Sequence, residues 1–277
     1  MRDKIESPAN GRLRLAANLQ RAARRHREGL FVCEGVRLCE VAADSDWELE
    51  YAVYTAGLGH EERGARLLDA LEQRGCALYE TEPRLYKKAS ATQSPQGILV
   101  VVRQRSYDWR QEAARLRQDA VVVVLDGVQD PGNVGTIIRT ADAAGAAAVL
   151  VRRGSADVYG DKVVRSTMGS LFHLPVISGL EPENIKAFAA AASMDIYATA
   201  LTPDAHTIYE TDMTGGLMLV FGSEANGVTP ELLQMSEALY IPMYGQAESL
   251  NVAGAAAITL YEAVRQRHAQ PAGHQQR

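Results

Sequence analysis

Short apolar runs alternate with amphipathic polar stretches along the first third of the chain. A basic stretch from about Arg12 to Arg27 predicts one helix, and Glu61 to Arg74 predicts another. The apolar runs between and after them predict strands. These strands are expected at Leu30 to Cys33, Leu49 to Tyr54, Ala77 to Tyr79 and Ile98 to Val102. Because helices and strands alternate, this part of the chain is expected to form a small α/β domain.

The rest of the chain opens with AVVVVL, Ala120 to Leu125, which is typical of a strand buried on both faces of a parallel sheet. Later strands are expected at Ala147 to Val151, Ile196 to Ala200, Leu217 to Phe221 and Tyr240 to Ile241. Helices are expected near Asn133 and over Lys162 to Leu171, Asn184 to Ala192 and Asn251 to Arg267. A polar stretch beginning at Arg103 indicates a linker. The sequence thus predicts two α/β domains, residues 1–105 and 106–277, the second with a mostly parallel sheet.

Composition adds a charge asymmetry to this picture. With 47% hydrophobic and 23% charged residues in 277, the chain is typical of a globular protein. Its net charge of −5 argues against a polyanion-binding protein, yet arginine is concentrated in the first 30 positions. Such a cluster can neutralise phosphates, and a solvated helix face is the equally open alternative. The candidate RNA-binding residues are Arg12, Arg14, Arg21, Arg24 and Arg25.

Several classes of site lack their motifs. Cys33, Cys39 and Cys76 form no C-x-x-C pair, so buried reduced thiols are expected. The histidines have no metal-ligand spacing, so no metal is expected. Neither G-x-G-x-x-G, the P-loop motif nor G-x-S-x-G occurs, which disfavours dinucleotide, nucleotide and serine-hydrolase sites. No leader or long apolar segment is evident, so the interpretation is a cytosolic protein without a membrane partner.

Two strand ends in the second part run into loops with candidate chemistry. Open α/β sheets bind ligands at such ends. In LDGVQDPGNVGTIIRT, Asn133 opens a helix and Arg139 follows about two turns later. In LMLVFGSEANG, the strand runs into Gly222 and Glu224, where glycine lets the backbone approach a ligand. The structural alternatives are an N-cap with a surface charge, and a tight turn.

A third junction is IPMYGQAESLNVAGAAA, in which Ser249 and Asn251 introduce the last helix. The first turns of that helix carry almost no side-chain bulk, so another helix or a loop is expected to approach it closely. The structural alternative is an alanine-rich, capped helix of high propensity.

In this order the three segments resemble the three motifs of the SpoU (TrmH-type) branch of the SPOUT RNA methyltransferases, over about Val121 to Arg267. The stretch SPANGRLRLAANLQRAARRHREGLFVCEGVRLCEVA is similar to the substrate-binding domain of that family, which resembles small ribosomal RNA-binding proteins. The resemblance implies a trefoil knot in the catalytic domain, S-adenosylmethionine bound within the knot, and a homodimer packed through it. The pattern alone would predict an unknotted doubly wound sheet, since general folding rules make knots rare.

The resemblance also implies roles for single residues. The positions that match the cofactor pocket are Gly222, Ile241, Leu250, Met243 and Asn251. The positions that match the catalytic residues are Asn133, Arg139, Glu224, Ser249 and Asn251. We expect Arg139 to contact the target ribose and stabilise a developing alkoxide, because a guanidinium is a poor base at neutral pH. The proton acceptor stays open.

The expected activity is therefore methylation of a ribose 2′-hydroxyl in RNA, with 23S ribosomal RNA as the preferred substrate. Transfer RNA is the alternative substrate. The alternative functions are a non-catalytic RNA-binding or ribosome-assembly protein and a methyltransferase acting on a base nitrogen. The modified nucleotide, and a housekeeping or antibiotic-protective role, stay open.

Overall fold

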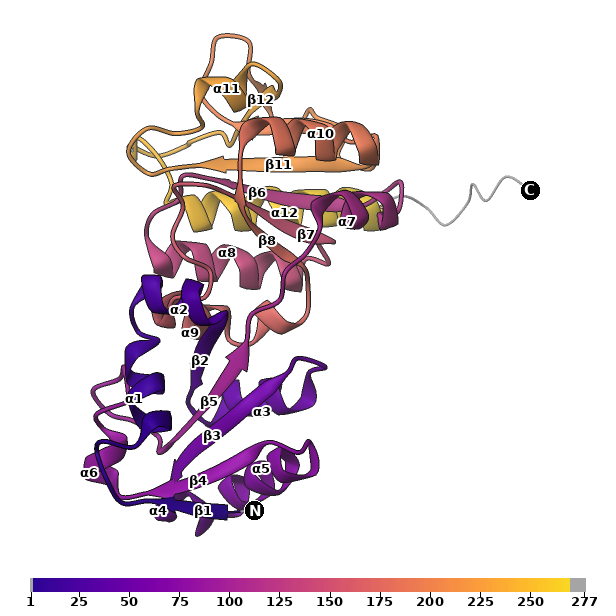
Figure 1. Cartoon of the computed structure of the whole chain (residues 1–277). Coiled ribbons are helices and arrows are strands. Elements are labelled where there is room, and N and C mark those ends of the chain that lie inside the picture. Colours follow the sequence, from indigo (N-terminus) through magenta and orange to yellow (C-terminus); the bar gives the residue numbers. More distant parts are fainter. Residues whose placement is uncertain (1, 270–277) are drawn as a thin grey trace. The chain divides into compact units, whose positions relative to one another are not determined.

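The chain divides into two compact units in the computed structural model, which describes residues 2–269. The first unit comprises Met1–Arg105 and Asp157–His173, and the second comprises Ser106–Ala156 and Leu174–Arg277 (Figure 1). Each unit has its own sheet with helices on both faces, so the expected α/β class is confirmed. We expected the first domain to consist of residues 1–105 alone. The structure adds the segment Asp157–His173 to the first unit.

The first unit contains a five-stranded mixed sheet of order β1-β4-β3-β5-β2. Its strands are β1 (Arg2–Ile5), β2 (Leu30–Glu34), β3 (Leu49–Thr55), β4 (Ala77–Thr81) and β5 (Ile98–Arg103). Its helices are α1 (Gly11–Asn18), α2 (Ala22–Glu28), α3 (Val36–Asp44), α4 (Ala56–Gly59), α5 (Glu62–Gln73), α6 (Pro83–Tyr86), α9 (Asp161–Thr167) and the short 3-10 helix η1 (Ser170–Phe172). Helices α1 and α6 cover one face of the sheet, and α3 and α5 cover the other (Figure 1).

The segment Asp157–His173 belongs to the first unit because its aromatic side chains complete the core there. The Tyr159 ring lies 4.9 Å from the Phe31 ring, and the Phe172 ring lies 5.0 Å from the Trp47 ring, centroid to centroid. Trp47 is 1% exposed. Aromatic pairs at these distances stabilise a fold beyond the area that they bury. The segment is therefore held by packing that hydrophobic periodicity could not reveal.

The basic helix expected from Arg12 to Arg27 is two helices, α1 and α2, with an extended residue, Arg21, between them. The break lets Arg25 turn inward, where it is 5% exposed. Its guanidinium donates to Asp157 Oδ2 from Nη2 at 2.6 Å and from Nε at 3.0 Å, and to the Leu19 carbonyl at 2.8 Å. Arg25 therefore forms a buried ion pair with Asp157 and is not exposed for contact with RNA. We had expected it to bind RNA.

The second unit contains a seven-stranded sheet of order β10-β12-β9-β11-β6-β7-β8, in which every pairing is parallel. Its strands are β6 (Val121–Asp126), β7 (Ala148–Arg152), β8 (Val176–Leu180), β9 (Asp195–Thr199), β10 (His206–Thr207), β11 (Leu217–Gly222) and β12 (Glu237–Tyr240). Its helices are α7 (Trp109–Arg115), α8 (Pro131–Ala143), α10 (Pro182–Ala192), α11 (Pro230–Leu233) and α12 (Val252–Ala269). The mostly parallel sheet predicted from the sequence is thus confirmed.

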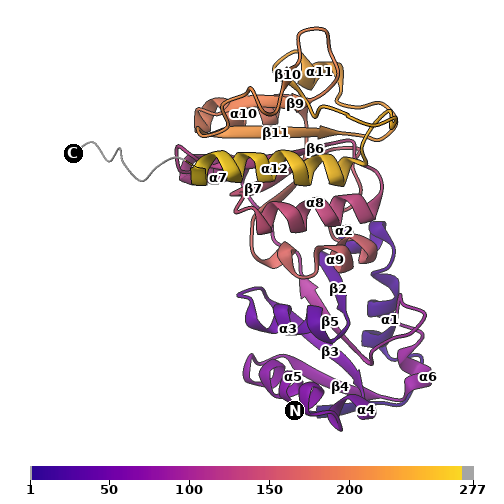
Figure 2. The same cartoon turned by 180° about the vertical axis from the view of Figure 1, so that it is seen from behind.

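Helices cover both faces of this sheet. Helices α7, α10 and α11 share a core cluster with alternate residues of β6 and β11. On the opposite face α8 and α12 pack against one another, which Figures 1 and 2 show from two sides. Every residue of β6 and β11 is buried, as expected for central strands. The two strands run in register, and Asp126 pairs with Gly222 at their carboxyl ends.

The helix expected over Lys162 to Leu171 is interrupted. Helix α9 ends at Thr167, and Met168 and Gly169 adopt positive φ angles of 53° and 106° before η1 begins. A Cβ on Gly169 would lie 2.9 Å from the Val41 side chain, so this position also requires close approach. In place of one helix, the structure has the seven-residue helix α9 followed by the three-residue 3-10 helix η1.

Cys33, Cys39 and Cys76 are buried free thiols, which confirms the prediction from their spacing. Burial raises the pKa of all three, that of Cys76 to about 12. Within residues 2–269, no helix is long and apolar enough to cross a membrane.

Candidate active site

A pocket of about 450 Å³ lies in the second unit, at the carboxyl ends of β9, β11 and β12. Its volume is within the range of roughly 300–1,000 Å³ usual for small-molecule sites. Four stretches of chain line it, residues 199–201, 222–227, 239–243 and 248–255, although not every residue of these stretches contributes. The pocket thus forms where ligands bind in open parallel sheets.

Gly222 ends β11 where another part of the backbone crosses it closely. A Cβ added to Gly222 would lie 2.0 Å from the Gly227 carbonyl carbon and 2.2 Å from the Val228 nitrogen. The loop between them is closed by two backbone hydrogen bonds, Ser223 N to Gly227 O at 3.0 Å and Gly227 N to Ser223 O at 2.9 Å. Only glycine allows this crossing, because any side chain would collide with backbone that cannot move aside.

Three polar side chains from different parts of the chain meet beside the pocket. The Asn133 amide donates to Glu224 Oε1 at 2.5 Å, and the Asn251 amide donates to Asn133 Oδ1 at 3.1 Å. Asn251 also accepts hydrogen bonds from the backbone amides of Ala253 and Gly254, which caps the start of α12. The three motifs, far apart in sequence, are thereby joined at one place.

Helix α8 positions Asn133. The helix begins at Pro131, and Asp130 is its N-cap, since Asp130 Oδ1 accepts from the backbone N–H of Asn133 at 2.9 Å. The capping role that the sequence left open for Asn133 therefore belongs to Asp130. The Asn133 side chain is thus free to bridge the other two motifs.

Every residue that the sequence analysis matched to the cofactor pocket lines the pocket in the structure. These residues are Gly222, Ile241, Met243, Leu250 and Asn251. Three of the residues matched to catalysis, Glu224, Ser249 and Asn251, line it. The structure brings the candidates together, while their individual roles stay predictions.

Of the residues matched to catalysis, only Arg139 neither lines the pocket nor joins the hydrogen-bonded group that contains Asn133. It is exposed on α8 and does not line the pocket. Among residues 2–269 its guanidinium makes no hydrogen bond or ion pair. A single copy of the chain therefore does not place the guanidinium against the other candidates.

Sequence reasoning missed several contributors to the pocket, of which Leu201 and Glu248 are examples. Leu201 follows the end of β9, and Glu248 precedes Ser249. The signal for Leu201 was its place just beyond a predicted strand, because the carboxyl ends of parallel strands share one edge of the sheet. Glu248 carried no signal of its own.

The chemistry of the lining fits S-adenosylmethionine. Within the described part of the chain, the pocket is lined by no lysine or arginine, which are the usual partners of phosphate groups. Apolar side chains such as Ile241 and Leu250 suit an adenine ring, and the carboxylates of Glu224 and Glu248 suit a sulfonium cation. Among residues 2–269 no group of three or more His, Cys, Asp or Glu side chains is placed to hold a metal ion. The metal-free mechanism stays a prediction.

The remaining candidate RNA-binding arginines differ in their availability. Arg12, Arg14 and Arg21 are exposed, and the Arg12 guanidinium lies 4.4 Å from the centre of the Tyr79 ring. Arg24 pairs with Glu28 at 3.0 Å and is half-buried. Exposed guanidinium groups of this kind can contact phosphates, which keeps these four residues as candidates.

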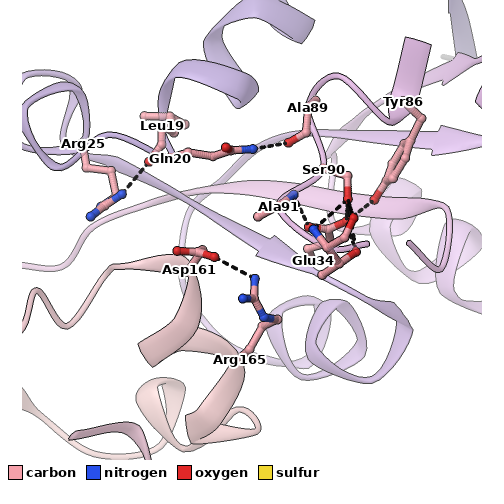
Figure 3. Close-up of polar contacts among 11 residues, drawn as sticks. Leu19, Gln20, Arg25, Glu34, Tyr86, Ala89, Ser90, Ala91, Asp161 and Arg165 are labelled. Atoms are coloured by element: carbon pink, nitrogen blue, oxygen red, sulfur yellow. Dashed lines mark hydrogen bonds and ion pairs between the residues drawn. The ribbon is translucent and has the colours of Figure 1, made fainter. Parts of the chain in front are cut away.

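A second hollow lies in the first unit around Glu34, which is 7% exposed (Figure 3). Glu34 accepts hydrogen bonds from the hydroxyls of Tyr86, Ser90 and Thr92 and from the Ala91 amide. Arg165, on the other side of the crevice, pairs with Asp161 at 2.9 Å. The hollow measures about 10 Å³, which admits one water molecule at most. It is therefore no small-molecule site.

Comparison with known proteins places this geometry in context. Residues 120–261 match the SpoU rRNA Methylase family, and residues 10–100 match the MRM3-like substrate binding domain. The 23S rRNA (guanosine(2553)-2′-O)-methyltransferase RlmP of Bacillus subtilis (strain 168) is 36% identical over 259 residues, which cover 93% of this chain and 98% of that protein. The 23S rRNA (uridine(2479)-2′-O)-methyltransferase of Streptomyces viridochromogenes is 32% identical over 250 residues, which cover 88% and 85%.

Solved structures give the same relationship. An AdoMet-bound rRNA methyltransferase from Sinorhizobium meliloti superposes with a TM-score of 0.84 at 29% identity, covering 95% of this chain and 98% of that one. The SpoU methyltransferase AviRb from Streptomyces viridochromogenes, in complex with AdoMet, superposes with a TM-score of 0.83 at 30% identity, covering 94% and 99%. The similarity spans both units of the chain.

Proposed function

Because this chain belongs to the SpoU rRNA methylase family, we propose that it transfers a methyl group from S-adenosylmethionine to a ribose 2′-hydroxyl of 23S ribosomal RNA. The observation that carries the proposal is the pocket at the sheet edge, where Asn133, Glu224 and Asn251 are hydrogen-bonded to one another. Within residues 2–269, the lining of the pocket contains carboxylates and no lysine or arginine, which suits a cationic ligand without phosphate groups. Relatives that match along nearly their whole length are named as 23S ribosomal RNA methyltransferases.

The chain's own residues supply position and charge. Bound S-adenosylmethionine would provide an electrophilic methyl group, and no further cofactor enters the reaction. Gly222, Ile241 and Leu250 would hold the donor, and the hydrogen-bonded Asn133 and Glu224 would orient the nucleotide beside it. Holding reactants in line contributes roughly 7–11 kcal/mol to lowering a barrier of this type. The main task of the pocket is therefore alignment.

Arg139 completes this site from a second copy of the chain. It is exposed outside the pocket of its own protomer, on the helix that packs against α12. Helix α12 presents Ile258 and Tyr261, 40% and 51% exposed, and Gly254 on one face, because these residues are spaced at helical intervals. Such an apolar face suits a homodimer interface. Across it, each Arg139 would stabilise the alkoxide that develops in the partner's pocket.

We propose a trefoil knot in the second unit, because the family resemblance implies one and because three motifs distant in sequence meet at the pocket. The backbone at residues 227–228 touches Gly222, and residues 248–251 close the same pocket. A cofactor held by such crossing segments contacts mainly backbone. An experimental structure of the cofactor complex, traced through residues 217–255, tests the knot. The proposed compartment is the cytoplasm, where ribosomes act.

The activity is tested by incubating the purified protein with S-adenosylmethionine and either protein-free 23S ribosomal RNA or transfer RNA. Mass spectrometry should find a new 2′-O-methylnucleoside in the ribosomal RNA, and alkali resistance should locate it. A methyl group on a base, or modification of transfer RNA alone, would contradict the proposal. RNA binding without any methyl transfer would support the assembly-protein alternative.

The shared site is tested by mixing two inactive variants. Arg139→Ala lacks the proposed activating charge, and Gly222→Ala lacks a usable pocket. Mixed dimers then contain one site with an intact pocket and an intact partner arginine, so mixing should restore activity that neither variant has alone. A mixture as inactive as its components, in which mixed dimers are shown to form, would contradict a shared site.

A further inference from the structure

Asp126 is fully buried at the carboxyl end of β6, directly beneath the proposed cofactor pocket. Its exposed fraction is 0%, and its register partner on β11 is Gly222. Asp126 itself does not line the pocket. Burying a carboxylate is costly unless it is paired and hydrogen-bonded. A buried carboxylate at this position is therefore expected to have hydrogen-bonding partners.

Two donors from separate parts of the chain satisfy this carboxylate. Arg152, at the end of the neighbouring β7, donates from Nη1 to Asp126 Oδ1 at 3.0 Å. The backbone amide of Thr229 donates to Asp126 Oδ2 at 2.6 Å. A carboxylate accepts from both sides, whereas the amide of asparagine would direct an N–H group at one of the two donors. Arg152 offsets the buried negative charge.

The pocket-lining loop runs from Gly222 to Gly227, and Thr229 lies just after the end of this loop. The loop starts at Gly222, which β11 holds in the sheet, and residues 222–224 and 227 line the pocket. Residues 227–228 then cross Gly222 in direct contact, and Thr229 follows as the N-cap of α11. The start of the loop is thus held by the sheet, and its end is held by Asp126.

We infer that Asp126 is a positioning residue for methyl transfer, which fixes the loop 223–227 in the shape that receives S-adenosylmethionine by holding the Thr229 amide. This inference rests on the proposed function. The clamp links three strand ends, since Asp126, Arg152 and the loop belong to β6, β7 and β11. If Thr229 moves, Gly222 and Glu224 must move as well, because residues 227–228 pack against Gly222 without free space.

Asp157 provides a matched control within the same chain. Its carboxylate also bridges an arginine and a backbone amide, accepting from Arg25 at 2.6 Å and from the Tyr159 amide at 3.0 Å. It lies in the first unit and does not line the pocket of the second. Replacing either aspartate by asparagine removes the same kind of contact, but only one of them adjoins the pocket.

The test compares Asp126→Asn with Asp157→Asn by calorimetric titration with S-adenosylmethionine and by thermal unfolding. Both variants should unfold at lower temperature. Asp126→Asn should bind the cofactor about 10- to 100-fold more weakly, the effect of losing a hydrogen bond to a charged group. Its KM for the cofactor should rise by more than kcat falls. Asp157→Asn should bind the cofactor as the wild type does.

A rescue variant separates positioning from general damage. Asp126→Asn combined with Arg152→Gln forms a neutral pair, because the carbonyl oxygen of the introduced glutamine can accept from the amide of the introduced asparagine. The side-chain oxygen of that asparagine can still accept from the Thr229 amide. Cofactor affinity should recover most of its loss. Wild-type affinity in Asp126→Asn, or an equal loss in Asp157→Asn, would overturn the inference.

Hydrogen exchange on the unaltered protein covers the case in which Asp126→Asn does not fold. The Thr229 amide should exchange slowly, and S-adenosylmethionine should slow exchange over residues 223–229 further. Fast exchange at Thr229 would overturn the inference. If the wild type itself does not bind S-adenosylmethionine, the proposed function fails instead, which is a distinct outcome.

Discussion

The Glu34 crevice of the first unit and the pocket of the second unit both form where loops follow strands, and both gather carboxylates. In the crevice, hydroxyl and amide donors surround Glu34 and leave room for a single water molecule. In the pocket, Glu224 receives one hydrogen bond from Asn133 and faces about 450 Å³ of open volume. A carboxylate satisfied internally stabilises the fold, whereas one with remaining acceptor capacity beside open space can serve a ligand.

Gly222→Ala should have the largest effect on cofactor binding, because it should disrupt the pocket. The new Cβ would overlap the backbone at Gly227, which must then shift the pocket-lining loop. Calorimetry should detect no binding of S-adenosylmethionine. Gly215→Ala is the control, because nothing lies within 4 Å of a Cβ at that position. Normal binding by Gly222→Ala would show that the crossing does not shape the pocket.

Asn133→Ala should separate catalysis from stability in the pocket. The substitution removes the hydrogen bonds to Glu224 and Asn251 from a half-exposed position. We expect kcat to fall about 10²-fold, the cost of a misplaced reactant, with an almost unchanged unfolding temperature. Thr136→Ala, an exposed position one turn along α8, is the control. A large loss of stability with normal kcat would reverse the assignment.

Glu34→Gln should show the opposite behaviour in the crevice. The glutamine amide places an N–H group where hydroxyl or amide donors already point. The free energy of unfolding should fall by about 1.5–3 kcal/mol, while affinity for S-adenosylmethionine stays at the wild-type value. Chemical denaturation and calorimetry measure the two quantities. Weaker cofactor binding at unchanged stability would show that Glu34 serves the cofactor site and does not stabilise the first unit.

The smallest effects are expected at the exposed arginines of the first unit. Arg14→Ala and Arg21→Ala should each weaken binding to ribosomal RNA and lower the slope of log affinity against log salt by about 0.7–0.9. Arg66→Ala is the control, since Arg66 pairs with Glu62 on α5, across the sheet from α1 (Figure 1). An unchanged salt slope in both variants would place the RNA-binding surface elsewhere.

Strands were the most predictable elements, and the exceptions have clear causes. The run AVVVVL predicted β6 because both faces of that strand are buried. Strand β1, with sequence RDKI, pairs with β4 at the sheet edge and lacks an apolar pattern. Strand β8 was missed because its exposed Ser178 and Gly179 interrupt the apolar run. The local hydrophobic pattern indicates which residues are buried. Strands at the sheet edge and strands with exposed positions are therefore not predicted by it.

Part of the candidate site could be predicted from the sequence. Gly222, Asn251 and Leu250 were found by motif, and the structure places all three at the pocket. The buried position of Arg25 was not predicted by the same reasoning, and the role of Arg139 stays a prediction. Arg25 turns inward to pair with Asp157, and Arg139 lies outside the pocket of its own chain. The direction that a charged side chain takes depends on partners that are distant in sequence.

The sequence by itself determined the α/β class, the buried strands, the loops at their carboxyl ends and the family. Hydrophobic periodicity and local motifs carry this information, because they depend on neighbouring residues. Only the tertiary structure showed that residues 157–173 complete the core of the first unit and that Asp126 holds the Thr229 amide. These contacts join positions separated by many residues, and the path of the folded chain decides which buried charge meets which donor.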